Sequence, residues 1–287
     1  ANNNTAVGTD SLKANTTGTQ NTAIGALAGD AMTTAGGNVG VGYKAMSALT
    51  TGGGNTAVGH QSMANGVVTG LYNTALGDGS LLVLTSGAEN VAVGKDALAA
   101  NTTANNNTAV GTEALKANTT GVENTSTGKG SLQANTTASY NTAVGSGALG
   151  DTTTGASNTA VGRGALNKNT TASNNTAVGQ SALGANTTGD SNTGLGVSAL
   201  QNNTTGTQNA AVGMNAMRDN TTGASNIAFG EGAFISNTTG SQNVALGRLS
   251  LFLNTTASNN TAVGFNALYA NTTGPSNTAI GINAGNG

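Results

Sequence analysis

The chain has no cysteine and no tryptophan, a single proline, and few charged or aromatic side chains. Without cysteine it forms no disulfide and has no thiolate chemistry. Charged residues make up 7% of its 287 residues, whereas about 25% is typical of a globular domain. A net charge of −2 provides no basic stripe for nucleic acid. No apolar run approaches the roughly 20 residues that span a bilayer. We therefore expect neither a nucleic-acid partner nor a membrane span.

What the chain has in abundance is Gly, Asn, Thr and Ala, with 45 glycines and 36% hydrophobic residues. Intrinsic disorder usually goes with a high net charge and few aliphatic side chains, and neither applies to this chain. The aliphatic residues also recur at regular intervals, which a disordered chain does not require. The composition therefore predicts an ordered chain, and the regularity indicates internal repeats.

The sequence repeats the 17-residue phrase N-T-A-V-G-x-x-A-L-x-x-N-T-T-G-x-x, whose first Asn we number position 1. Every spacing is 17 residues except one of 18, between Asn55 and Asn73. Position 5 is Gly in every copy, and position 9 is Leu or Met in fourteen copies. Every charged residue falls at position 6, 7, 10, 11, 16 or 17, which indicates that these positions face water. The position 1 residues are Asn4, Asn21, Asn38, Asn55, Asn73, Asn90, Asn107, Asn124, Asn141, Asn158, Asn175, Asn192, Asn209, Asn226, Asn243, Asn260 and Asn277.

The repeat predicts an all-β fold, a parallel β-solenoid or β-roll of seventeen coils. Seventeen residues are too few for two packed helices, and Asn, Thr and Gly oppose helix. Positions 1–5 alternate in the period of a strand, positions 8–10 are expected to form a second strand, and N-T-T-G is expected to turn. We expect large aliphatic residues such as Val110 and Leu115 to form the core. The repeats form a single expected domain over residues 1–287, with irregular coils at about 29–89.

The small side chains of the repeat lead to an expected assembly. Asn at position 1 is expected to stack in a ladder, and Gly at position 5 either turns the chain or allows close backbone approach. Positions 1, 3 and 5 form a face of small residues that suits packing against another chain, and the core is thin. We therefore expect a homo-oligomer, with a trimer favoured. An end-to-end polymer is the alternative, because Ala1 and Gly287 fall at positions 15 and 11 without a polar cap.

The phrase N-T-A-V-G-x-x-A-L-x-x-N-T-T-G resembles the repeats of phage and bacterial tail-fibre-domain proteins, many of which carry an endosialidase-type intramolecular chaperone. Its first half is similar to the head repeats of trimeric autotransporter adhesins, which form left-handed parallel β-rolls. The resemblance covers essentially the whole chain and is weakest across residues 29–89. It implies a homotrimeric fibre that is extracellular, on a cell surface or on a virion. Such a fibre presents a separate tip domain to a cell-surface or glycan ligand.

No residue pattern points to catalysis. The single histidine, His60, lies at the outward position 6, and the repeat pairs no carboxylate with a second one. We see no acid–base pair, triad or metal cluster. The glycines lack the Lys and the following helix of a phosphate-binding loop. We therefore expect that the chain is not an enzyme and that it has no catalytic residues, no metal and no cofactor.

Two apolar stretches interrupt the polar surface that the repeat predicts. Position 10 carries Ile235, Phe252 and Tyr269 in three successive coils, with Phe265 and Leu249 close by. These side chains are candidate contacts for a carbohydrate or other ligand, or for a sister chain or an adjoining domain. The second stretch replaces the N-T-T turn and marks a bend or junction; it consists of Val67, Val68, Leu71 and residues 81–84.

The threonines and asparagines of the repeat allow two further interpretations, N-glycosylation and ice binding. The N-T-T triplets are formal N-glycosylation acceptors, although turn chemistry explains them equally well. They begin at Asn15, Asn101, Asn118, Asn135, Asn169, Asn186, Asn203, Asn220, Asn237, Asn254 and Asn271. Twelve of the seventeen position 2 residues are Thr, so an ice-binding face is also conceivable. It is the least expected function, because position 2 shares its face with Val at position 4, which we place in the core.

The leading expectation is thus the shaft of a phage tail fibre or of a bacterial surface adhesin. Stacked coils would act as a stiff spacer that holds a binding or anchoring domain away from the particle. A self-assembling extracellular filament subunit is the alternative.

Overall fold

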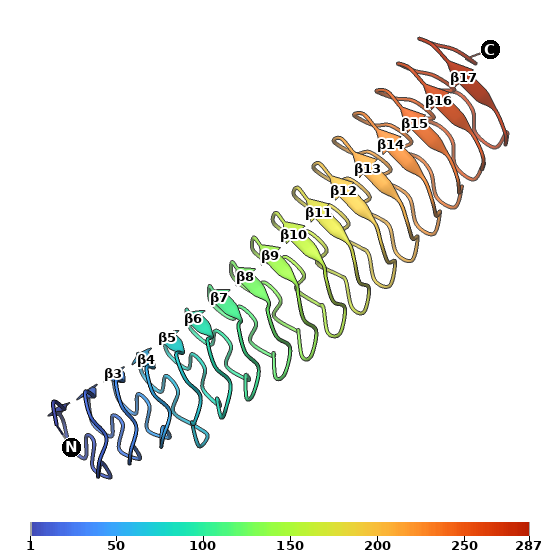
Figure 1. The fold of residues 1–287 in the computed structure, drawn as a ribbon. Helices are drawn as coiled ribbons and strands as arrows, with labels where there is room; N and C mark the ends of the chain where they lie inside the picture. The colour runs from blue at the N-terminus through green and yellow to red at the C-terminus, as the bar shows by residue number, and fades with distance from the viewer. Residues whose placement is uncertain (1, 287) are drawn as a thin grey trace. The chain divides into compact units, whose positions relative to one another are not determined.

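The computed structural model describes residues 2–286, and those residues form strands and turns without a helix. Each repeat contributes one three-residue strand at positions 2–4, and strand follows strand in parallel (Figure 1). The prediction of an all-β parallel β-solenoid is therefore confirmed. Ala1 and Gly287, on which the expectation of uncapped ends rests, lie outside the described residues.

The chain divides into two compact units, Ala1–Asn141 and Thr142–Gly287, each of which is a stack of coils. The first unit holds β1 (Thr5–Val7), β2 (Thr22–Ile24), β3 (Val39–Val41), β4 (Thr56–Val58), β5 (Thr74–Leu76), β6 (Val91–Val93), β7 (Thr108–Val110) and β8 (Thr125–Thr127). The second unit holds β9 (Thr142–Val144), β10 (Thr159–Val161), β11 (Thr176–Val178), β12 (Thr193–Leu195), β13 (Ala210–Val212), β14 (Ile227–Phe229), β15 (Val244–Leu246), β16 (Thr261–Val263) and β17 (Thr278–Ile280).

Within each unit the strands pair without any shift in register. Thr5 pairs with Thr22 in the first unit, and Thr159 pairs with Thr176 in the second. Residues at the same repeat position therefore lie one above the other, about 4.8 Å apart. Side chains at the same repeat position form a continuous row along each unit.

The strands face the opposite way from our expectation. Ala109 at position 3 is fully buried, whereas Val110 at position 4 is 37% exposed. Position 1 also lies inside, because the amide of its Asn bonds to the coil interior. A strand alternates its faces, so position 3 must follow position 1 inward. The predictions that Val110 forms the core and that positions 1 and 3 contact a sister chain are wrong. Leu115 is buried in the core, as predicted.

The predicted second strand at positions 8–10 does not form. Residues at positions 7 and 9 adopt positive φ instead, as at Glu113 (59°) and Leu115 (50°). A strand would send the adjacent positions 8 and 9 to opposite faces, whereas here both Ala114 and Leu115 are fully buried. The left-handed conformation is costly for a residue other than glycine, and the burial of two consecutive side chains offsets that cost.

Gly at position 5 both turns the chain and lies against the next coil. Gly145 has a φ of 129°, and a Cβ placed on it would lie 2.6 Å from the carbonyl oxygen of Gly162. The same contact with the following position 5 glycine recurs along the first unit, for example between Gly59 and Gly77. A side chain is therefore excluded on two grounds, which explains why the glycine is present in every copy.

The predicted irregular coils have the same strands as the other coils and differ from them in the side chains that they bury. At the place of the second Asn of the repeat, position 12, they bury Met32, Leu49 and Leu84. In the coil of β2, position 9 is Gly29, and the Met32 side chain fills the space next to it. The apolar stretch does not form one surface, because Leu81 and Leu84 are buried while Val67 and Leu71 are exposed.

Candidate interaction surfaces

An asparagine ladder at position 1 links each coil to the next from the inside. The backbone N–H of Asn90 donates to Asn73 Oδ1 (3.0 Å), and that of Asn107 donates to Asn90 Oδ1 (3.0 Å). The Nδ2 of Asn90 also donates to the buried carbonyl oxygen of Ala104 (2.8 Å), at position 15 of its own coil. One side chain thus satisfies a backbone donor and a backbone acceptor, and burial without those partners would be costly.

A second ladder, at position 12, carries the asparagines of the N-T-T triplets. Asn220 Nδ2 donates to Asn203 Oδ1 (2.7 Å) and to the carbonyl oxygen of Gly223 (3.0 Å). Of the eleven asparagines that begin N-T-T triplets, Asn15 and Asn271 are half-buried and the others are buried. Glycan attachment to a buried acceptor would require its coil to open, because the amide nitrogen that would carry the glycan faces inward.

The outer face of the strands is formed by positions 2 and 4, and we call it the strand face. The side chains at positions 2 and 4 are exposed or half-buried in every coil, and Val178 is 40% exposed. Among residues 2–286, no hydroxyl of a position 2 threonine makes a hydrogen bond to the protein. Position 13 threonines differ, since Thr187 Oγ1 donates to the carbonyl oxygen of Thr204 (3.0 Å) in the next coil. The strand face therefore presents free hydroxyls beside exposed methyl groups.

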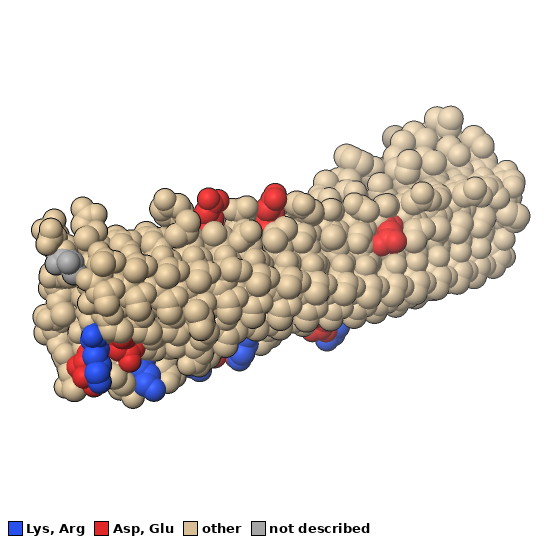
Figure 2. Space-filling model, turned by 60° about the horizontal axis from the view of Figure 1, so that its bottom comes forward, with Lys and Arg blue, Asp and Glu red and all other residues tan. Residues whose placement is uncertain are grey.

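Charged side chains avoid the strand face, and more than half of them pair with one another along the coil corners. Lys116 contacts Glu113 (2.8 Å) and Asp96 (3.6 Å), and Arg218 contacts the adjacent Asp219 (2.8 Å). Figure 2 shows wide areas without charge between the charged side chains. The hydrogen bond from Lys116 lowers the pKa of Glu113, and the hydrogen bond from Arg218 lowers that of Asp219.

One carboxylate in the first unit has the opposite shift. Burial raises the pKa of Asp30, and only in smaller part does its own backbone hydrogen bond lower it. Its Oδ1 is buried without a hydrogen-bond partner. Asp30 occupies position 10, where most coils carry a polar or small residue. The residue is thus a local weakness of its coil and not part of a cluster of acidic groups.

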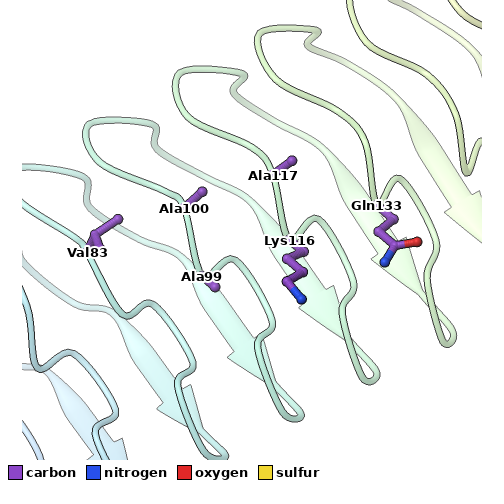
Figure 3. Close-up of a pocket in the computed structure, with 6 residues that line it drawn as sticks. All are labelled: Val83, Ala99, Ala100, Lys116, Ala117 and Gln133. Carbon is purple, nitrogen blue, oxygen red and sulfur yellow. The ribbon is translucent and has the colours of Figure 1, made fainter.

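An open hollow of about 560 Å³ lies over positions 10 and 11 of the coils that include β5 to β8 (Figure 3). It exists because alanines stand there in place of longer side chains. Its polar groups are already engaged, since Lys116 and the Gln133 amide (2.8 Å) both bond to Glu113. The hollow thus offers an apolar floor and no free acid or base. Its lining residues are Val83, Ala99, Ala100, Lys116, Ala117 and Gln133.

The candidate contact residues of the second unit do not form one patch. Phe252 and Tyr269 stack with ring centroids 5.0 Å apart and planes at 1°. Ile235, also at position 10, is only 8% exposed and belongs to the core. Phe265 lies at position 6, where the Arg248 guanidinium sits 5.9 Å from its ring centroid. The structure thus brings together Phe252 and Tyr269, and they cover one another.

His60 is part of a ladder of unlike side chains at position 6. Its Nδ1 lies 3.0 Å from Asp78 Oδ1, and its ring stacks on Tyr43 at 5.5 Å. Across residues 2–286 no three His, Asp or Glu side chains are grouped so that they could hold a metal ion. Over the same residues, no helix suited to crossing a membrane is present.

Comparisons with known proteins identify no relative. No family model matches the chain, and a search of curated proteins found no match. The resemblance to tail-fibre and adhesin repeats therefore rests on the repeat phrase itself.

Sequence reasoning missed the strand face, although a signal for it was present. Position 3 is restricted to Ala, Gly or Ser in all copies, whereas position 4 accepts residues as different as Thr127 and Phe229. A crowded interior restricts side-chain size, and an open surface does not. The outward positions of this strand are recognised by the range of side-chain sizes that they accept, and not by hydrophobicity.

Proposed function

We propose that this chain is a stiff structural shaft of an extracellular fibre, of the kind found in phage tail fibres and bacterial surface adhesins, and that it performs no catalysis. The shaft acts as a spacer that holds a separate ligand-binding or anchoring domain away from a particle or cell. Its location is outside the cell, on a cell surface or on a virion. The repeat phrase and the solenoid fold support this role together.

The observation that carries the proposal is that, within each unit, each coil bonds to the next at several points around its perimeter. Besides the strand ladder, the N–H groups of Leu183, Ala185 and Thr187 donate to carbonyl oxygens of the following coil at 2.9 Å. Inside, the position 1 ladder adds a bond at every step, such as Asn209 N–H to Asn192 Oδ1 (3.0 Å). Bending a coil away from its neighbour breaks bonds on several sides at once, so each stack resists bending. A rigid spacer requires that property.

The oligomeric state belongs to the proposal. The homotrimer implied by the repeat phrase stays a prediction, and the structure changes where its contacts can be. Positions 1 and 3 lie inside the coil, so a sister chain must use outward positions. The filament alternative predicts a native mass that rises with concentration. Light scattering over a dilution series separates the two, because the trimer predicts a constant mass of three chains.

The spacer role is tested by changing the length of the second unit. Deleting three whole coils, residues 158–208, should shorten the particle by about 14 Å in small-angle scattering and leave its cross-section and protease resistance unchanged. The matched control deletes residues 158–206, which leaves one coil two residues too long, so any new protease site should lie in that coil while the other coils stay resistant. A particle whose length does not change after the in-register deletion, or a chain that proteases digest readily before any deletion, would overturn the shaft proposal.

A further inference from the structure

We propose that the strand face of the second unit, over β9 to β12, binds ice. This function goes beyond the shaft role and does not depend on it. The four coils carry Thr142, Thr159, Thr176 and Thr193 at position 2. Position 4 of the same coils carries Val144, Val161, Val178 and Leu195. The ligand is the surface of crystalline water, an uncharged lattice that repeats in two dimensions.

The strand face over β9 to β12 has a regular two-dimensional geometry. The strands β9 to β12 pair in register, so their threonines form one straight row and their aliphatic residues form a parallel row. Residues in a row repeat about every 4.8 Å, and the two rows lie about 6.6 Å apart, two residues along a strand. The result is a two-dimensional array of hydroxyl and methyl groups. The water oxygens on ice surfaces repeat over distances of the same order.

The chemical groups of the strand face suit an ordered layer of water. No position 2 hydroxyl is bonded to any described residue, so each remains free to bond to water. The methyl groups of Thr and Val beside it offer water no partner and restrict its orientation. Water is therefore held at the hydroxyls and ordered between them. A charged side chain would impose a different hydration, and the strand face carries none in any coil.

A repeating face suits a crystal lattice better than a protein partner. A protein partner needs a unique register, and a face that repeats with every coil offers an equivalent fit after a shift of one coil. A crystal lattice has no such requirement.

The extent of the site follows from the sequence of the same face. Position 2 changes to Ala210, Ile227 and Val244 in the next three coils, and Phe229 protrudes at position 4. The hydroxyl row is therefore interrupted from β13 to β15. These residues also show that the face accepts large side chains without loss of the strand, since β14 contains both Ile227 and Phe229.

The experiment measures thermal hysteresis, ice-crystal shaping and adsorption of the labelled full chain to a growing ice surface. The face variant is Thr159→Lys with Thr176→Lys. The matched control is Thr171→Lys with Thr188→Lys, at the exposed position 14 of the same two coils, which adds the same charge on another side. We expect the unchanged chain to shape and adsorb to ice, the face variant to lose at least five-fold in hysteresis, and the control to keep its activity.

Folding is checked by circular dichroism and thermal unfolding. A second, uncharged face variant, Thr159→Tyr with Thr176→Tyr, keeps the test valid if the lysine variant does not fold. Absence of hysteresis, shaping and adsorption in the unchanged chain would overturn the proposal, as would equal losses in the face and control variants. A native mass that falls on Thr176→Lys would assign the face to a sister chain and also overturn it. None of these outcomes changes the coil-deletion test of the shaft role.

Discussion

The coils of residues 29–89 and the regular coils of the second unit have the same strands but different interiors. The regular coils bury Asn at position 12, or Thr152 in the coil of β9, whereas the irregular coils bury Met32, Leu49 and Leu84 there. Position 1 is Asn in both regions. In the irregular coils the carbonyl oxygen at position 15 still accepts a bond from position 1, as Gly87 does from Asn73 Nδ2 (2.9 Å).

The difference shows that the two asparagine ladders are not equivalent. The position 1 side chain accepts a bond from a backbone N–H of the next coil and donates to the position 15 carbonyl. The position 12 side chain mainly gives that carbonyl a second donor. A buried acceptor with one good partner does not require another. Position 12 can therefore become apolar, and position 1 cannot.

The largest expected effect comes from a residue that is common to both regions. Replacing Gly145 or Gly59 by Val should destabilise the local coils by about 4 kcal/mol, since a Cβ meets the next coil and the φ is positive. Hydrogen exchange should show lost protection in the coils on either side. If either variant kept full thermal stability, position 5 would not be the crowded turn described above.

The next largest effect should come from the position 1 ladder, at the place where the irregular coils meet the regular ones. Asn90→Ala should lower the free energy of unfolding by about 3 kcal/mol, because the Asn107 N–H loses its acceptor and the Ala104 carbonyl oxygen loses its hydrogen bond from Asn90 Nδ2. Chemical unfolding combined with hydrogen exchange at Asn107 measures the loss. Exchange at Asn107 that stays as slow as in the unchanged chain would contradict the role given to position 1.

A polar residue placed in the apolar interior should have a smaller effect. Leu49→Asn should cost about 2 kcal/mol, because the new amide has Met32 and Val68 as its ladder neighbours and the leucine volume is lost. The measurement is the thermal unfolding midpoint, with Leu49→Met as the volume-conserving control. Equal midpoints for the two variants would mean that the interior does not discriminate at this position.

Extending the apolar interior by one coil should cost less still, about 1 kcal/mol. In Asn101→Leu the Ala104 carbonyl keeps its bond from Asn90 Nδ2 (2.8 Å), and the Ala104 N–H loses the Asn101 Oδ1 (3.2 Å). In the neighbouring apolar coil the equivalent N–H, that of Gly87, bonds to the Thr102 carbonyl oxygen (3.2 Å) instead. If Asn101→Leu lowered the free energy of unfolding as much as Asn90→Ala, the position 12 ladder would matter as much as the position 1 ladder, and the ranking given above would be wrong.

The smallest expected effects concern how stability depends on pH, and they have opposite signs at Asp219 and Asp30. The pKa of Asp219 is lowered by Arg218, so its contribution is present above the ordinary aspartate value and is lost as pH falls through the lowered pKa. The pKa of Asp30 is raised by burial, so its coil gains stability as pH falls through the raised pKa, with the gain complete below the ordinary value.

Hydrogen exchange on acidification tests both signs in one sample. Protection should rise around Asp30 and fall around Asp219, and the variants Asp30→Asn and Asp219→Asn should remove these changes. Protection that moves in the same direction at both sites would show that the paired and the buried carboxylate do not differ as described.

Much of the fold could be predicted because the repeat imposes one solution on every coil. A strand within positions 1–5, the inter-coil ladder of Asn and the constrained Gly at position 5 all follow from spacing and residue type. The direction of the strand could not be read from hydrophobicity, since Val110 is larger and more apolar than Ala109 yet lies outside. The exposure of the candidate contact residues could not be read from the sequence either, since at position 10 Ile235 is buried and Phe252 is half-buried.

The amino-acid order alone settles the coil length, the stacking of like residues and the places of charge, because these depend only on periodicity. It does not settle which side of the strand is the interior. That choice follows from the hydrogen bonds of the position 1 amide and from the left-handed turn that sends both Ala114 and Leu115 inward. Those bonds join residues from different coils, so they exist only in the folded stack. Their consequence is a row of free hydroxyls on the outside, where hydrophobicity alone had predicted a core.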